Sequence, residues 1–184
     1  MNEPAAPRED FDPAATALLD LARERPWSEI SLRDVAERAG VELVDLYGEA
    51  RGKAAILWRI SEMLDRAALR TAATPSEEDP HDRLFDAAMA RIEAMEPHRP
   101  ALVALSREAP RLVAAAHFPA TARAILEAAG VPATAPRVAG MTLAWARVVQ
   151  VWRDDEGALN RTMAELDKRL RQLRSRLGRI GAGF

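Results

Sequence analysis

Apolar residues recur every three or four positions along most of the chain, and no segment alternates apolar and polar residues for long enough to predict a strand. In the first part of the chain this period predicts helices over about 12–25, 31–39, 42–48 and 52–71. Asp12 before Pro13 is a typical helix start, and Ser31 with Asp34 has the spacing of a capping box. The pattern therefore predicts an all-α protein.

The second part of the chain predicts a further set of helices. Pro, Ser and acidic residues make 72–80 a predicted linker. Beyond it the period predicts helices over about 81–95, 100–109, 112–129 with an interruption near Pro119, 135–153 and 159–177, followed by a disordered tail over 178–184. We therefore expect two units, a headpiece with its connecting helix over 12–71 and a helical bundle over 80–180.

Composition excludes most kinds of catalytic site. The chain has 184 residues and no cysteine, so disulfides and thiolate sites are absent. Its 3 histidines are scattered, and the acidic run Asp154-Asp155-Glu156 is typical of a solvated loop at a helix end. We therefore predict no enzyme activity, no metal and no cofactor. The polar start of the chain and the lack of a long apolar run predict a cytoplasmic protein.

The net charge of −2 conceals a gradient along the chain. Residues 1–57 carry 7 basic and 12 acidic groups, whereas residues 158–184 carry 7 basic and 2 acidic groups. DNA affinity comes largely from basic groups that displace counterions, so the acidic front end is poorly suited to DNA. Attraction to anionic lipid or nucleic acid is instead expected at the basic end.

The headpiece sequence has the pattern of a helix-turn-helix. The residues that carry it are Trp27 to Ser31, Asp34 to Ala36, Ala39 to Val41, Leu46-Tyr47, and Lys53 with Ile56-Leu57. The segment resembles the N-terminal domain of TetR-type regulators. This resemblance implies a TetR-like fold in which the helix after Gly40 enters the major groove of DNA, and a homodimer that binds an operator and is released by a hydrophobic effector.

The expected recognition helix departs from what DNA binding requires. Residues 41–49 contain Glu42, Asp45 and Glu49 and no basic residue, and neither a Ser/Thr N-cap near Glu42 nor an aromatic residue near Ala50 is present. The candidate DNA contacts that remain are Arg33, Tyr47, Arg51 and Lys53. Two interpretations stay open. In one, the headpiece is a structural scaffold that does not bind DNA; in the other, it binds an operator and its acidic side chains point away from the DNA.

An apolar stripe along the predicted helix 135–153 suggests a ligand pocket. The stripe would pack in the bundle core, form a dimer interface, or line an apolar cavity with residues of neighbouring helices. The predicted pocket residues are Met89, Ile92, Leu102, Leu105, Phe118, Met141, Trp145, Val148 and Trp152.

The last predicted helix is amphipathic and basic. Leu166, Leu170, Leu173 and Leu177 fall at spacings of 4, 3 and 4, and arginines such as Arg171 and Arg174 occupy the rest of its surface. Such a helix can lie on an anionic membrane. The alternative is a terminal helix that packs its leucines on the body or on a second subunit.

A second resemblance covers residues 80–172. The segments that carry this resemblance are Leu84 to Asp86, Met95 to Pro100, Leu143 to Arg147, Asp154 to Glu156 and Thr162 to Leu170. They are similar to the lipid-binding accessory protein family of coenzyme Q (ubiquinone) biosynthesis. This resemblance implies a non-catalytic protein that binds a lipid or isoprenoid quinone and presents it to a partner enzyme, in peripheral contact with the inner face of a membrane. That function is the leading hypothesis from the sequence, and a TetR-type transcriptional regulator is the alternative.

Overall fold

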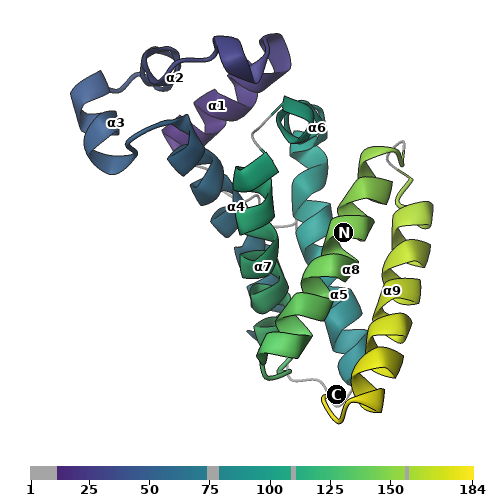
Figure 1. The fold of residues 1–184 in the computed structure, drawn as a ribbon. Helices are drawn as coiled ribbons and strands as arrows, with labels where there is room; N and C mark the ends of the chain where they lie inside the picture. Colours follow the sequence, from purple (N-terminus) through teal and green to yellow (C-terminus); the bar gives the residue numbers. More distant parts are fainter. Residues whose placement is uncertain (1–11, 74–78, 109–110, 156–157) are drawn as a thin grey trace, which may run out of the picture.

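The computed structural model describes residues 12–73, 79–108, 111–155 and 158–184. Within these ranges the chain forms α-helices joined by turns and 3₁₀ segments and contains no strand, which confirms the all-α prediction. Figure 1 shows the short N-terminal helices at one end of the molecule and a bundle of longer helices below them.

The three short helices form a unit that we call the headpiece, α1 to α3. Its elements are α1 (Pro13–Glu24), a 3₁₀ segment (Trp27–Glu29), α2 (Leu32–Ala39) and α3 (Leu43–Glu49). The helix ends follow the predicted local chemistry, because Asp12 accepts from the Ala15 amide at 2.9 Å and Ser31 forms a complete capping box with Asp34. Gly40 ends α2 with a left-handed φ of 69°, a conformation that glycine adopts without steric cost.

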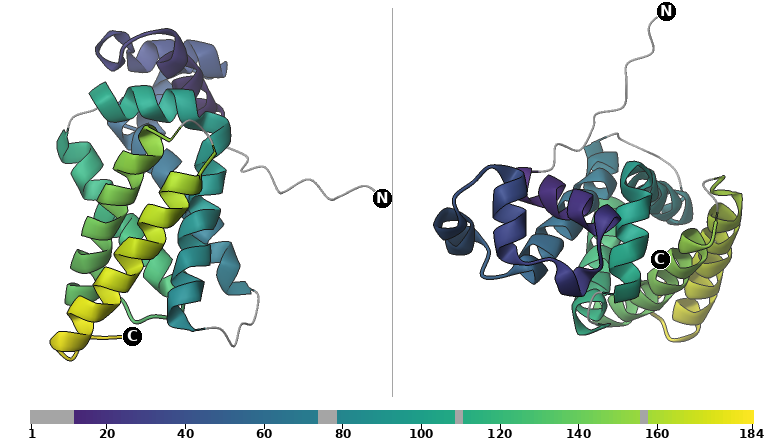
Figure 2. Two further views of the ribbon diagram at one scale, coloured as in Figure 1. Left: turned by 90° about the vertical axis from the view of Figure 1, so that its right-hand side faces the viewer. Right: turned by 90° about the horizontal axis from the view of Figure 1, so that it is seen from above.

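The longer helices form a unit that we call the body. Its elements are α4 (Lys53–Arg70), α5 (Pro80–Met95), α6 (Arg99–Glu108), α7 (Arg111–Ala128), α8 (Ala135–Arg153) and α9 (Asn160–Arg179), with 3₁₀ segments at 71–73 and 96–98. Figure 2 shows α6 crossing the end of the bundle beneath the headpiece, while the other body helices run lengthwise. Of the predicted linker 72–80, residues 74–78 lie outside the described residues.

Two sequence predictions about local order are wrong. Helix α7 continues through Pro119, where an interruption was expected. A proline inside a helix removes one backbone hydrogen bond, and here the burial of Thr121, Ala122 and Ile125 against the bundle offsets that loss. The tail 178–184 is held rather than disordered, because Arg137 donates to the carbonyls of Ala182 and Gly183 at 3.0 and 2.6 Å.

Candidate functional site

An apolar cavity of about 120 Å³, partly open to solvent, lies in the body between α4, α5, α6, α7 and α8. Its walls are Leu57, Ile60, Ser61, Leu64, Arg91, Met95, Leu102, Leu105, Ser106, His117, Phe118, Trp145, Val149 and Trp152. Because α4 joins the body to the headpiece, four of these residues lie on the helix that connects the two units.

The cavity includes part of the predicted pocket. Leu102, Leu105, Phe118, Trp145 and Trp152 line it, on α6, α7 and α8. The other four predicted pocket residues do not line it and are buried in the surrounding core: Met89, Ile92, Met141 and Val148. The helical period correctly identified the inward face of α8, but it does not tell which part of an inward face borders empty space.

A buried arginine forms the polar centre of the cavity. The Arg91 Nε donates to Asp65 Oδ1 at 2.6 Å, and its Nη2 donates to Ser61 Oγ at 3.2 Å. Thr121 Oγ1 donates to the same Asp65 oxygen at 2.9 Å, and the guanidinium lies 5.0 Å from the ring centre of Trp145. Burial lowers the pKa of Arg91, whereas the Asp65 carboxylate raises it. The result is a paired charge inside an otherwise apolar site.

His117 is the second polar group on the cavity wall. Only 8% of the residue is exposed, and its ring meets the Trp58 ring edge-on at a centroid distance of 4.4 Å. Its Nε2 is buried and has no hydrogen-bond partner among the described residues. Burial lowers the pKa of His117, and the positive charge of Arg91 lowers it further, so the imidazole is neutral at pH 7. A buried polar atom without a partner is rare and points to a ligand or a water that completes it.

Arg91 and His117 were missed in the sequence analysis. A signal for Arg91 exists, because Leu84, Ala88, Arg91 and Met95 follow one another at helical spacings of 4, 3 and 4. An arginine in the middle of such a stripe must be buried with a partner. His117 lies on α7 between alanines and Phe118, and no comparable signal marks it.

The rim of the cavity is fixed by a cluster at the end of α5. Trp152 Nε1 donates to Glu96 Oε1 at 2.5 Å, and Arg99 donates to both Glu96 oxygens at 3.1 and 2.7 Å. Arg99 also donates to the Trp152 carbonyl at 2.5 Å and stacks 4.4 Å from its ring centre. These contacts join the start of α6 to the end of α8, so the cavity has one rigid edge.

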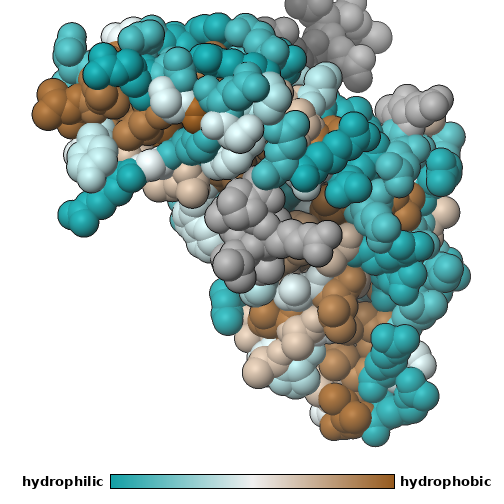
Figure 3. Space-filling view, turned by 45° about the horizontal axis from the view of Figure 1, so that its top comes forward, coloured by the Kyte–Doolittle hydropathy of each residue, from teal (hydrophilic) through white to brown (hydrophobic). Residues whose placement is uncertain are grey.

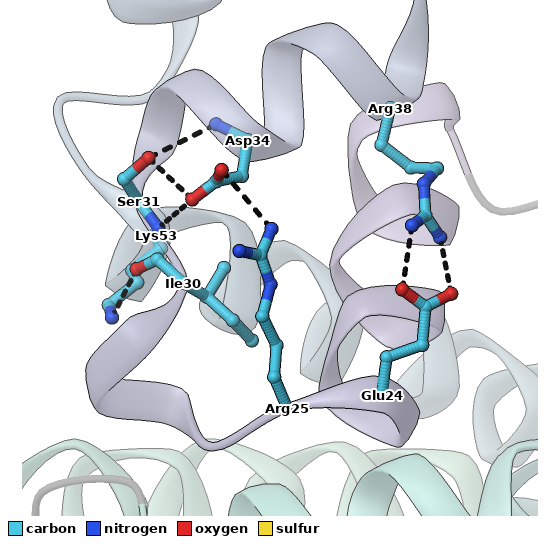
Figure 4. A network of polar contacts seen from close by, with 7 residues as sticks. All are labelled: Glu24, Arg25, Ile30, Ser31, Asp34, Arg38 and Lys53. Atoms are coloured by element: carbon cyan, nitrogen blue, oxygen red, sulfur yellow. Dashed lines mark hydrogen bonds and ion pairs between the residues drawn. The ribbon is translucent and has the colours of Figure 1, made fainter.

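Most headpiece cations are bound within the chain. Figure 4 shows Arg25 paired with Asp34 and Arg38 paired with Glu24 through two contacts. Lys53, a predicted DNA contact, instead donates to the carbonyls of Ile30 at 2.6 Å and Trp27. Its ammonium closes the turn that precedes α2, so it is not a phosphate contact in this structure.

The remaining predicted DNA contacts meet on one surface. Arg33, Tyr47 and Arg51 line a shallow groove with Leu32, Glu42, Leu43, Val44 and Gly52. The groove lies over α3, at the left of the headpiece in Figure 3, where hydrophobic side chains reach the surface. Val44 is 76% exposed and Tyr47 is 57% exposed. Arg33 and Arg51 are therefore placed where they could reach a polyanion that enters this groove.

The three acidic residues of the predicted recognition helix also face solvent. Glu42, Asp45 and Glu49 are all exposed, and among the described residues only Glu49 has a cationic partner, Arg59 at 3.3 Å. Glu42 occupies the N-cap position of α3 without making a side-chain cap. The acidic groups are not turned inward, so the negative charge expected from the sequence is present on this face.

Helix α9 does not present its leucines to a membrane. Leu166, Leu170, Leu173 and Leu177 are at most 5% exposed, because they pack against α8 and α5 in the core of the body. This corrects the prediction that they form a membrane-binding face. Arg171 and Arg174, the basic residues of the same predicted membrane-binding surface, are exposed. They pair with Asp167 and Asp79 respectively.

Neither a metal cluster nor a transmembrane helix is found in the described ranges. No three side chains of His, Asp or Glu there come together as metal ligands.

The acidic run after α8 is not simply a solvated loop, because Asp155 is 4% exposed and accepts from the Thr162 amide and hydroxyl at 2.8 and 2.7 Å. Glu156 lies outside the described residues. No described helix is long and apolar enough to span a bilayer.

Comparison with known proteins identifies the fold. No family model and no curated protein matches the sequence. A TetR transcriptional regulator from Rhodococcus sp. RHA1 matches with a TM-score of 0.66 and 18% identity, over 90% of this chain and 96% of its own. A TetR-family transcriptional regulator from Streptomyces coelicolor matches with a TM-score of 0.52 and 17% identity, over 96% of this chain and 84% of its own. The chain therefore has the TetR-like fold, a helix-turn-helix headpiece on a helical bundle.

Proposed function

We propose that the chain is a non-catalytic, ligand-responsive transcriptional regulator of the TetR type. The single observation that carries this proposal is the cavity that α4 forms with α5, α6, α7 and α8, with the unpartnered Nε2 of His117 in its wall. The solved structures that are similar to this chain are named as transcriptional regulators, which supports a regulatory function here. A ligand in this cavity would touch the helix that leads directly to the headpiece.

Helix α4 is tied to the headpiece at its first turns. Lys53 at its start holds the carbonyls of Trp27 and Ile30, and Arg59 pairs with Asp12 and Glu49 at 3.5 and 3.3 Å. Further along the same helix, Leu57, Ile60, Ser61 and Leu64 line the cavity. A ligand that shifts α4 therefore moves the groove over α3, and coupling of this kind is reciprocal between ligand and DNA.

On the DNA side, the regulator would use Arg33, Tyr47 and Arg51. These side chains line one groove on the helix-turn-helix. The acidic residues beside them weaken attraction to the phosphate backbone in general, so binding must rely on specific contacts to an operator. A homodimer would supply two such headpieces for the two halves of the site.

Titration of DNA from the gene's own upstream region tests this function. Fluorescence anisotropy over a salt series should show sequence-specific binding that weakens as salt rises. Arg51→Ala should weaken binding, whereas Arg176→Ala, which removes the same charge from the exposed surface of α9, should not. Wild-type protein that binds its upstream DNA no better than unrelated DNA would reject the regulator function.

The exposed acidic residues of α3 favour a second candidate function. In this function the headpiece no longer binds DNA, and the chain binds a lipid or isoprenoid quinone for a partner enzyme of ubiquinone biosynthesis. It would contact the inner face of the membrane from the cytoplasm, through cations such as Arg171 and Arg174. Mass spectrometry of lipid that co-purifies with the protein, together with sedimentation on anionic vesicles, tests it. Lipid-free protein that does not sediment with vesicles would reject this function.

A further inference from the structure

We propose that the cavity of the body binds an uncharged, single-ring phenol, whose hydroxyl group bonds to Arg91 and His117. This inference rests on the proposed function, since it names the class of ligand that the regulator would sense.

The size of the cavity favours a small ligand. Its volume is about 120 Å³, of the same order as an apolar cavity of about 150 Å³ in a protein interior that accommodates a benzene molecule. The walls suit an aromatic ring, because Trp145, Trp152 and Phe118 face the same space.

The polar groups of the cavity require a hydrogen-bonding ligand. The Nη1 of Arg91 donates to the thioether of Met95 at 3.0 Å, and a thioether is a weak acceptor for a guanidinium. The Nε2 of His117 is buried and finds no partner in the part of the chain that the structure describes. Benzene cannot form a hydrogen bond with either group. A ring that carries one polar atom facing Arg91 and His117 would give both groups a hydrogen-bond partner.

The charge balance of the site favours a ligand without net charge. The carboxylate of Asp65 already neutralises Arg91 at 2.6 Å, and the imidazole of His117 is neutral. An aromatic carboxylate would therefore add an uncompensated negative charge to a buried apolar site, which is costly. An ammonium group would add a positive charge beside Arg91.

A hydroxyl is the group that fits both polar partners. It can accept from the Arg91 guanidinium, and it can donate to His117 Nε2 or accept from it, whichever tautomer the imidazole adopts. A carbonyl can only accept. The phenolic hydroxyl thus satisfies Arg91 and His117 in either state of the histidine.

Calorimetric titration of the full-length protein with phenol, benzene and benzoate tests this inference. Phenol should bind at least about tenfold more tightly than benzene, a difference of about 1.4 kcal/mol, and benzoate should bind more weakly than phenol. Quenching of tryptophan fluorescence gives an independent measure, because Trp145 and Trp152 line the cavity.

A variant of His117 identifies the partner of the hydroxyl. His117→Phe keeps a ring at this position and removes Nε2, so the preference for phenol over benzene should fall to within about threefold while benzene still binds. The matched control is His81→Phe, the same substitution at a histidine that does not line the cavity, and it should keep the tenfold preference.

The outcomes separate this inference from the proposed function. Equal binding of phenol and benzene by the wild type, or an unchanged preference in His117→Phe, overturns the phenol assignment. Binding of benzoate in place of phenol overturns the ligand class but leaves a ligand site in the body. Failure of phenol, benzene and benzoate to bind overturns the phenol assignment, whereas the titration with upstream DNA decides the regulator function separately.

Discussion

Arg91 and Asp65 form an ion pair that is almost fully enclosed by the body. The Nε of Arg91 lies 2.6 Å from Oδ1 of Asp65, and the two residues are 5% and 7% exposed. The pair joins α5 to α4, and Thr121 of α7 donates to the same carboxylate oxygen. Three helices around the cavity are thus held together by one charged cluster.

The first prediction concerns the stability of this pair. Arg91→Met should lower the free energy of unfolding by about 3–5 kcal/mol, because it leaves the carboxylate of Asp65 buried without its cation. The double variant Arg91→Met, Asp65→Leu should lose less than the single variant, since no unpaired charge remains. Urea unfolding followed by circular dichroism measures both. A single variant within about 1 kcal/mol of the wild type would show that the pair is not enclosed as described.

The second prediction is a pH dependence at the start of α2. Hydrogen bonds from the side chain and then the amide of Ser31, with the nearby Arg25, lower the pKa of Asp34 from 3.8 to about 2. Because the pKa is lower in the folded state, this carboxylate contributes stability above pH 3.8 and the contribution is lost as pH falls towards 2. The difference in stability between wild type and Asp34→Asn should therefore shrink across this range, as measured by thermal unfolding. Glu37→Gln, at an exposed position on the same helix, is the control.

Much of the fold follows from local chemistry that the sequence displays. The helical period located the helices, and Ser31 with Asp34 and Gly40 marked the ends of α2 where the structure has them. The errors at Pro119 and in the tail have a different cause. Both depend on tertiary contacts, such as those of Arg137 with the tail carbonyls, which no local pattern contains.

The candidate site was predictable in its apolar part alone. Trp145 and Trp152 were expected in a pocket because they share one face of a helix, and both line the cavity. Met141 and Val148 share that face too but are packed in the core, because the position of a void depends on how neighbouring helices fit. His117 was missed because its significance is the lack of a partner for Nε2, which only the folded structure reveals.

The third prediction concerns the negative charge of α3. Neutralising Glu42 and Asp45 in the variant Glu42→Gln, Asp45→Asn should strengthen binding to unrelated duplex DNA about fourfold at low salt. Each charge repels a phosphate at ~10 Å in water by about 0.4 kcal/mol, which corresponds to about a factor of two. Fluorescence anisotropy at low and high salt measures the effect, which should vanish at high salt.

A control isolates the position of these charges. Asp154→Asn removes one exposed negative charge from the end of α8, and it should leave DNA affinity almost unchanged. An equal gain from Asp154→Asn and from a single substitution on α3 would mean that net charge alone determines the affinity. The exposed acidic residues of α3 would then have no special role in DNA binding.

The fourth prediction uses the close approach of α8 and α9, where a Cβ at Gly140 would collide with Cδ1 of Leu173. Gly140→Ala should lower stability by about 1 kcal/mol, since overpacking of about 1–3 kcal/mol exceeds the gain of about 1 kcal/mol in helix propensity. Leu173→Ala should cost about 2–5 kcal/mol. In the Leu173→Ala background, Gly140→Ala should instead stabilise, because the collision is gone.

Urea unfolding of the wild type, the two single variants and the double variant measures the coupling between the two positions. Gly178→Ala, whose Cβ meets nothing within 4 Å, is the control. Additive effects of the two substitutions would show that α8 and α9 do not meet at this point.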